Sequence, residues 1–261
     1  MIELLKIEFL KIKHYTVFKA FMIIFAVILP LVLFGISTIK FFGFPTQERI
    51  LGFPEIWGNI TYIAGWVNLL PGILVVALVC NEVTFKTQKQ NVIDGLSRLD
   101  VIMSKFYVVL ALSLVITAYV VLLGFAFGLI FSNGGSVFSG FENVLFFFLQ
   151  TLGIFSLALL LAVIIRIAAL SILAYMFVFL LLGVTLGQFL GADLALWMPT
   201  NMLADLTPFP LYDTVLRMQR MADNSAEVTP DINQWIRVLI SSCYTFGFIL
   251  LSFFIMKKRD L

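Results

Sequence analysis

The sequence predicts an all-α integral membrane protein, and its composition is the first reason. Hydrophobic residues make up 61% of the 261 residues, charged residues only 12%, and the mean hydropathy is +1.06. A soluble domain carries about 25% charged residues, so this chain has too few polar groups to cover a globule in water. The net charge of +2 is too small to indicate a nucleic-acid partner.

The second reason is a series of long apolar runs, which together form a single transmembrane domain over residues 1–261. A helix crosses the hydrocarbon core, about 30 Å thick, with about 20 apolar residues. Six stretches qualify, namely 20–39, 61–81, 106–131, 144–165, 167–189 and 237–256. Only Arg166 separates the fourth from the fifth, and one helix over both would be about twice too long. We therefore expect a hairpin with a tight turn at Arg166.

The distribution of Lys and Arg predicts the orientation of these spans. With both termini in the cytoplasm, the cytoplasmic segments hold twelve of the seventeen basic residues and six of the fifteen acidic ones. The net charge is then 12 − 6 = +6 inside and 5 − 9 = −4 outside, as the positive-inside rule requires. An aromatic belt is expected at the outer boundary, formed by Trp57, Tyr62, Trp66, Trp197 and Trp235.

The segments between the spans predict helices that do not cross the membrane. Residues 1–17 have the apolar spacing of an interfacial amphipathic helix. The outer segment 190–236 begins too apolar for a solvated loop and is too interrupted by proline to span. We expect short helices there that dip into the outer interface.

The segment 82–105, between the second and third spans, is polar for this chain. Apolar residues recur at helical spacing from Phe85, and Gly95 is a typical helix stop, so a helix is expected over Thr84–Gly95. Ser97 and Asp100 have the spacing of a capping box that opens the next helix. From this pattern alone, the segment is equally well explained as an interfacial helix between two spans.

This segment resembles the cytoplasmic segment of the permease subunits of type-2 ABC exporters. In that family a Glu and a Thr about five residues later precede an apolar pair, a Leu/Ile-Ser-Arg turn and a Lys. The matching residues are Glu82, Thr87, Val92-Ile93, Leu96-Ser97-Arg98 and Lys105, while Lys86 stands where family members usually have Gly. The likeness extends over nearly the whole chain, including the turn at Arg166 and a Pro199-Thr200-Asn201 element in the outer segment.

The resemblance implies a homodimer in a bacterial cytoplasmic membrane, bound to two ABC ATPase subunits. The helix Thr84–Gly95 would be the coupling helix. Its ATPase-coupling residues would be Glu82, Phe85, Thr87, Val92, Leu96 and Arg98. The chain contains no G-x-x-x-x-G-K-[ST] sequence, so ATP and Mg²⁺ are expected in the partner, with no cofactor and no catalytic residue in this chain.

Polar and small residues within the spans are candidates for a transport pathway or for the dimer interface. They are Asn68, Gln150, Gly183, Thr185, Gly187 and Gln188. Glycines at every fourth position allow close helix approach, but packing within one protomer explains Gly183 and Gly187 equally well. For Gly124 and Gly128, packing within the protomer is the favoured explanation.

Two other functions stay open. A permease-like subunit could transmit ATPase motion to an extracytoplasmic partner, as in the family's copper-enzyme maturation systems. A lipid-modifying enzyme could use the outer acidic residues Asp193, Asp205 and Asp213. The single histidine, His14, lies outside every predicted span, which argues against a histidine-dependent protease and against a metal site. An amphiphilic or lipophilic substrate is favoured, because no ionisable residue lies at a predicted membrane midplane.

Overall fold

The computed structural model describes residues 15–38, 51–85, 87, 90, 93, 98–132, 134–182, 185, 192–208 and 232–258. All regular secondary structure in these ranges is helical, as the sequence predicts. The helices are α2 (Thr16–Thr38), α4 (Ile56–Val67), α5 (Leu69–Thr84), α7 (Arg98–Phe131), α8 (Glu142–Ile165), α9 (Ala168–Phe177), the π-helix η1 (Val178–Leu182), α11 (Ala192–Leu196), α12 (Pro199–Ala204) and α14 (Gln234–Lys258).

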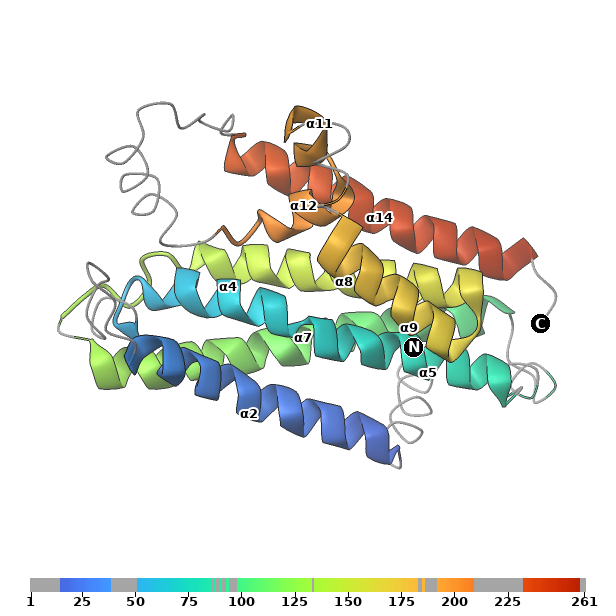
Figure 1. The fold of residues 1–261 in the computed structure, drawn as a ribbon, viewed down its shortest axis with the longest axis horizontal. Helices are drawn as coiled ribbons and strands as arrows, with labels where there is room; N and C mark the ends of the chain where they lie inside the picture. Colours follow the sequence, from blue (N-terminus) through green and yellow to red (C-terminus); the bar gives the residue numbers. More distant parts are fainter. Residues whose placement is uncertain are drawn as a thin grey trace.

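The long helices form one elongated bundle whose axis runs horizontally in Figure 1. We call its two ends after Glu82 and Pro54. The Glu82 end holds the end of α5, the start of α7, the turn between α8 and α9, and the end of α14. The Pro54 end holds the start of α4, the end of α7 and the starts of α8 and α14.

Five helical stretches are long and apolar enough to cross a membrane. They are Thr16–Gly35, Ile56–Thr84, Met103–Phe131, Glu142–Ile165 and Gln234–Lys258. The predicted second span, 61–81, was too short, because the helix starts at Ile56 and ends at Thr84. The predicted fifth span, 167–189, is described as a helix over Ala168–Leu182. The total of six spans therefore stays a prediction.

The second span is interrupted where its sequence changes. Asn68 separates α4 from α5. Pro71, three residues later, has no N–H to donate to the carbonyl of Val67, so the ladder of helical hydrogen bonds is broken at this turn. The two helices still run end to end along the bundle (Figure 1).

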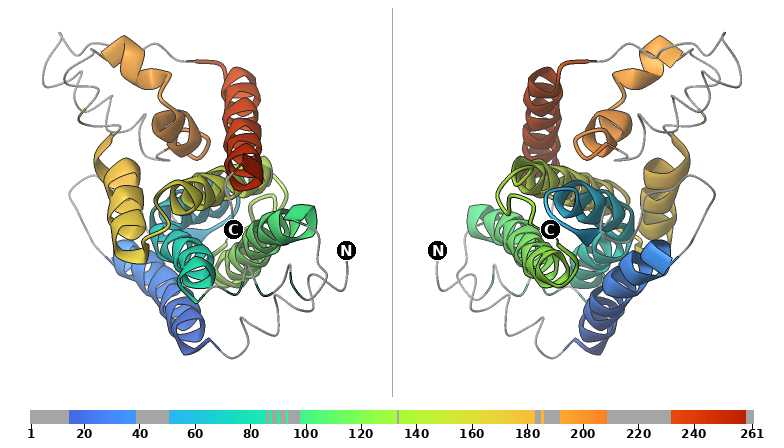
Figure 2. Two further views of the ribbon diagram at one scale, coloured as in Figure 1. Left: turned by 90° about the vertical axis from the view of Figure 1, so that its right-hand side faces the viewer. Right: turned by 90° about the vertical axis from the view of Figure 1, so that its left-hand side faces the viewer.

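Helix α8 is the centre of the bundle. Two thirds of its most apolar window (67%) is buried, against 17% for α2 and for α14. It packs against α4, α5, α7, α9, α12 and α14. Gly153 allows this density, because a Cβ there would lie 2.4 Å from a methyl carbon of Leu203 on α12 and 2.8 Å from the hydroxyl of Thr245 on α14. The end-on views of Figure 2 show α2, α9 and α14 on the outside.

The predicted hairpin at Arg166 is confirmed. Helix α8 ends at Ile165, Arg166 has a left-handed backbone (φ 63°), and Ile167 is extended before α9 begins. The amide of Arg166 donates to the carbonyl of Ala162, as in a left-handed helix cap. This two-residue connection ties α9 firmly to the end of α8.

An aromatic cluster fills the core near the Pro54 end and corrects the predicted belt. Trp57 is fully buried, its indole N–H donates to the carbonyl of Val137 (2.8 Å), and its ring contacts those of Phe125 and Phe141 edge-on. Trp57 is therefore a core residue. Trp66 is exposed, and its position at the membrane boundary stays a prediction. Trp57 was misassigned because this span starts five residues earlier than predicted.

Gly124 and Gly128 make room for this cluster. A Cβ at Gly124 would lie 2.6 Å from the Trp57 ring, and one at Gly128 would lie 2.3 Å from the Phe53 ring. Both glycines serve packing within the protomer, which confirms the favoured explanation for this pair.

Candidate functional site

At the Glu82 end, a buried ion pair joins the two helices on either side of the polar segment. The ammonium group of Lys105 on α7 donates to Oε1 of Glu82 on α5, and both side chains are buried, Lys105 at 4% and Glu82 at 10% exposure. The pair was not predicted, although both residues belong to the resemblance motif. A buried charge is retained only when it is paired, so this contact fixes the end of α5 against the start of α7.

Further hydrogen bonds stabilise the C-terminal end of α5. The hydroxyl of Thr87 donates to the carbonyl of Glu82 (3.3 Å), and the hydroxyl of Thr84 donates to the carbonyl of Cys80 (3.0 Å). The amide group of Asn81 donates to the hydroxyl of Tyr15, just before α2 (2.7 Å). Three helices, α2, α5 and α7, are therefore joined next to the polar segment.

Two large apolar side chains of the polar segment are exposed. Phe85 is 72% exposed and Ile93 is 83% exposed. They lie beyond the ends of α5 and α7, at the end of the bundle that also carries charged residues. The remaining part of the predicted helix Thr84–Gly95 lies outside the described residues, apart from Thr87 and Gln90.

Buried polar side chains hold the middle of the bundle together. The amide nitrogen of Asn68 donates to the hydroxyl of Thr151 on α8 (2.8 Å). Cys80 lies 3.4 Å from the hydroxyl of Ser171 on α9, and both are fully buried. Contacts between helices satisfy polar groups away from water, so Asn68 serves at least as a structural link between α5 and α8.

Helix α9 contacts the bundle through a narrow stripe. Its only buried residues are Ser171 and Tyr175. The Tyr175 hydroxyl lies so close to Gly72 that a Cβ there would be 1.9 Å away. Among the described residues, neither this hydroxyl nor Oδ1 of Asn68, one turn before Gly72, has a hydrogen-bond partner. The spacing of the two polar residues in an otherwise apolar helix was the sequence signal for this stripe.

The Tyr175 hydroxyl leads to a stability prediction with an internal control. Tyr175→Phe removes a hydroxyl that makes no hydrogen bond, so we expect the free energy of unfolding to stay unchanged or to rise. Tyr119→Phe breaks the bond from that hydroxyl to the carbonyl of Ala26 and should cost about 0.5–1.5 kcal/mol. Thermal unfolding of the full chain in nanodiscs measures both. A larger loss for Tyr175→Phe than for Tyr119→Phe would contradict the assignment.

Residues 192–208, part of the segment 190–236 that is predicted to be outer, contain short helices, as predicted. Helix α12 begins with Pro199, and the side-chain amide of Asn201 donates to the carbonyl of Ala195 (2.8 Å). Side chains of α14 bond to the carbonyls at the end of α12 and after it. These bonds are Ser241 to Met202 (3.1 Å), Arg237 to Asp205 (3.3 Å) and Gln234 to Leu206 (2.9 Å).

Gln150 on α8 binds the same segment from the other side. Its amide nitrogen donates to the carbonyl of Ala204 (3.4 Å), and its carbonyl accepts from the hydroxyl of Thr207 (2.9 Å). A Cβ at Gly65 on α4 would lie 3.0 Å from this carbonyl oxygen. Burial raises the pKa of the neighbouring Asp205 carboxyl, while the charge of Arg237 opposes that rise. Gln150 therefore fastens the outer segment to the bundle.

The structure brings some of the predicted site residues together and leaves others outside the described ranges. Glu82, Phe85 and Thr87 lie at one end of the bundle, while Asn68 and Gln150 lie along the contact between the second span and α8. The hydroxyl of Thr185 donates to the carbonyl of Leu181 in η1 (2.8 Å). Arg98 is described as the first residue of α7. The residues outside the described ranges are Val92, Leu96, Gly183, Gly187 and Gln188.

These features define the class of the protein: an all-helical protein embedded in a membrane through several long apolar helices. Among the described residues, no group of three His, Cys, Asp or Glu side chains could hold a metal ion.

The chain belongs to the family described as "Protein of unknown function (DUF2705)", whose sequence model matches residues 21–261. No match was found among the curated proteins with which the sequence was compared.

Proposed function

We propose that the chain is the membrane-spanning permease subunit of a type-2 ABC exporter, which dimerises and binds two ATPase subunits at its Glu82 end. The observation that carries the proposal is the segment between α5 and α7. Its Phe85 and Ile93 side chains are exposed, while a buried ion pair holds its two ends together. Exposed apolar side chains beside charged ones are typical of a docking site for a protein partner.

The ion pair also supports a mechanical role for this segment. Because Glu82 and Lys105 link α5 to α7, a force on the connection between these helices moves both together. Asn68 breaks the second span between α4 and α5 and supplies a point at which the span can bend. ATP-driven closure of the partner would thereby favour one of two arrangements of the bundle.

The charges of the described residues support a cytoplasmic Glu82 end. Six basic and two acidic residues lie there, so the net charge is 6 − 2 = +4. The Pro54 end holds one basic and three acidic residues, so its net charge is 1 − 3 = −2. By the positive-inside rule, this difference supports a cytoplasmic Glu82 end. The basic residues of that end are Lys19, Arg98, Lys105, Arg166, Lys257 and Lys258.

The charge-free middle of the long helices supports an amphiphilic or lipophilic substrate. In the helices that are long enough to span a membrane, every Lys, Arg, Asp and Glu within the described ranges lies towards one end or the other. A strongly charged solute would find no counter-charge on these helices half way across.

A second candidate is a subunit that transmits motion to a partner on the far side. The hydrogen bonds from Gln150 and α14 to residues 202–207 favour it, because they make the outer segment move with the bundle. Exported substrate in a reconstituted complex would favour the first candidate, and ATPase activity that rises only with a far-side protein would favour the second.

Phe85→Asp tests the proposal, with Phe138→Asp as the matched control. Both phenylalanines are exposed, Phe85 at 72% at the Glu82 end and Phe138 at 75% at the Pro54 end. We co-express each variant with the proposed ABC ATPase partner and measure the ATPase retained per permease and its hydrolysis rate. Phe85→Asp should lose about tenfold or more in affinity for the ATPase, and Phe138→Asp should bind as the wild type does. Equal binding by both variants would overturn the proposed docking end.

A further inference from the structure

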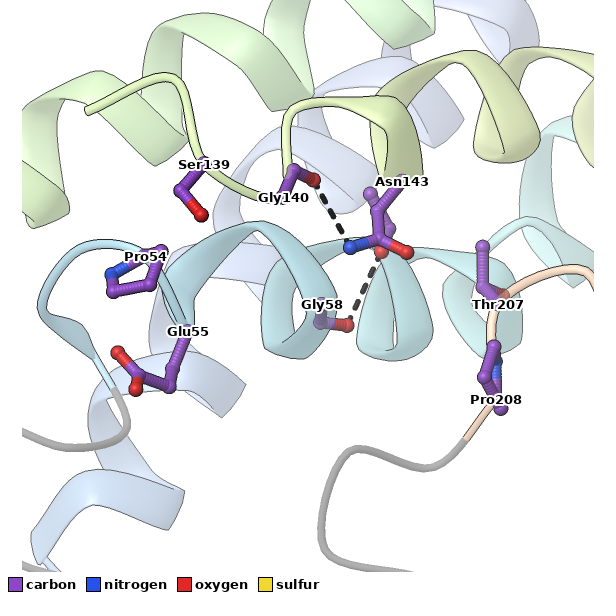
Figure 3. A pocket seen from close by; sticks show the side chains of 9 residues that line it. Pro54, Glu55, Gly58, Ser139, Gly140, Asn143, Thr207 and Pro208 are labelled. Atoms are coloured by element: carbon purple, nitrogen blue, oxygen red, sulfur yellow. Dashed lines mark hydrogen bonds between the residues drawn. The ribbon is translucent and has the colours of Figure 1, made fainter. Parts of the chain in front are cut away.

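Polar groups without a hydrogen-bond partner are costly only where water does not reach them. At the Pro54 end, the start of α4, the connection before α8 and the residues after α12 surround a hollow of about 300 Å³ (Figure 3). The Glu55 carboxylate on its wall is exposed, so water can bond to it. The middle of the bundle is different. The hydroxyl of Tyr175 on α9 and Oδ1 of Asn68 are both fully buried, and neither has a partner within the described ranges.

These two buried atoms are a donor and an acceptor about one helical turn apart. The amide of Gly72 donates to the carbonyl of Asn68 (3.0 Å), so Asn68 and Gly72 lie on the same face of the second span. The Tyr175 hydroxyl lies against Gly72. Four residues of a helix rise about 6 Å. The hydroxyl and the Asn68 side chain therefore do not bond in this arrangement, but a movement of a few ångströms would bring them together.

Helix α9 is held in a way that allows such a movement. Ser171 and Tyr175 are its only buried residues, and the rest of its surface is exposed or half-buried. It is tied to α8 only at its start, and it continues into the π-helix η1, a type of turn found mostly at functional sites. A tilt of α9 about its start, together with a rotation of the Tyr175 side chain, carries the hydroxyl towards Asn68.

The Asn68 side chain is already oriented for a second bond. Its amide nitrogen donates to the hydroxyl of Thr151 on α8 (2.8 Å), which fixes the side chain and leaves Oδ1 as an acceptor. Asn68 also lies at the break between α4 and α5. A hydrogen bond from Tyr175 would therefore join α9 to the point at which the second span can bend.

Two contacts favour the arrangement that the structure describes. The Tyr175 ring packs against Gly72, and the thiol of Cys80 donates to the hydroxyl of Ser171 (3.4 Å). A thiol is a weak donor, whereas a bond between two buried neutral groups is strengthened by the low local dielectric. The present arrangement therefore gains packing, and a shifted one gains the stronger hydrogen bond.

We propose that α9 has two arrangements against the second span, and that a hydrogen bond from the Tyr175 hydroxyl to Oδ1 of Asn68 stabilises the second. In the first, which the structure describes, Cys80 bonds to Ser171 and the Tyr175 hydroxyl is unbonded. The two arrangements exchange in the protein by itself, and any ligand that binds one of them better shifts the balance. The proposal does not depend on an ATPase partner.

The experiment measures the position of α9 in the full chain, in nanodiscs and without an ATPase. Nitroxide labels are attached to Leu173→Cys on α9 and to Leu251→Cys on α14, two exposed positions. The background is Cys243→Ser, because Cys243 is exposed and would react, while Cys80 is buried. Double electron–electron resonance then gives the distribution of distances between the two labels, and we expect two populations.

Two further variants should shift these populations in opposite directions. Tyr175→Phe removes the proposed bond and should lower the second population about fivefold. Ser171→Ala removes a contact of the first arrangement and should raise the second. The matched control is Tyr119→Phe, which breaks the bond to the carbonyl of Ala26 and should leave the distribution unchanged. A single distance in both the wild type and Ser171→Ala, or equal shifts in Tyr175→Phe and Tyr119→Phe, would overturn the proposal.

Discussion

Lys105→Met is expected to destabilise the protein by about 3–5 kcal/mol, because it removes the buried cation that pairs with the Glu82 carboxylate. Both side chains are shielded, with 4% and 10% of their surfaces exposed, so water cannot replace the lost charge. The free energy of unfolding, measured for the full chain in mixed micelles, tests this. Lys257→Met removes an exposed lysine at the same end of the bundle and should change it by less than about 1 kcal/mol.

The double variant Glu82→Gln/Lys105→Met tests the contribution of the ion pair to stability separately from its role in the proposed coupling. It removes both charges at once, so we expect most of the stability lost in Lys105→Met to return. A double variant as unstable as the single one would show that Lys105 stabilises α7 by some other contact. The same double variant should keep its fold and yet respond less to the proposed ATPase partner, since α5 and α7 are no longer linked by charge.

Gly72→Ala is expected to destabilise the protein by about 3 kcal/mol, at the upper end of the range for overpacked cores. The new Cβ would lie 1.9 Å from the Tyr175 hydroxyl and 2.4 Å from the ring carbon that bears it. A ring is rigid, so the whole of α9 must move away from α5. Gly35→Ala is the matched control, because a Cβ there meets nothing within 4 Å. It should be neutral or stabilise α2 by up to about 1 kcal/mol.

Tyr175→Leu should rescue Gly72→Ala in part, because it removes the end of the ring that the new Cβ meets. The double variant is then expected to be more stable than the sum of the two single effects predicts, as it is for residues in contact. Thermal unfolding of all four proteins in nanodiscs measures the coupling. If the destabilising effects of the two single variants were strictly additive, the Tyr175 ring on α9 would not contact Gly72 as described.

The sequence predicted most of the helical architecture because the bilayer limits the choice. The turn at Arg166 was predicted from length alone, since one helix cannot span over forty apolar residues. The predicted starting residues of the helices at the Pro54 end were less accurate. Trp57 and Trp66 were assigned to a membrane boundary, but an indole is equally suited to a core when its N–H finds a carbonyl, as that of Trp57 does at Val137.

The sequence indicated which residues belong to the candidate site, but not which of them contact one another. Glu82 and Lys105 were both recognised as parts of one motif, yet 23 positions separate them, and no periodicity shows which basic residue a buried acid will meet. Gln150 was recognised as a polar residue in a span, but its partners, Ala204 and Thr207, are more than fifty positions away. Side-chain pairs across helices depend on packing, which local pattern does not contain.

The sequence by itself determined that this is a helical membrane protein with a tight α8–α9 hairpin and a polar segment at one end, because water and lipid sort residues by hydropathy wherever they lie in the chain. Only the tertiary structure decided that Lys105 pairs with Glu82 and that the Tyr175 ring packs against Gly72. The reason is physical: each of these contacts joins groups from different helices, and its energy depends on distances of a few ångströms that exist only after the helices have packed.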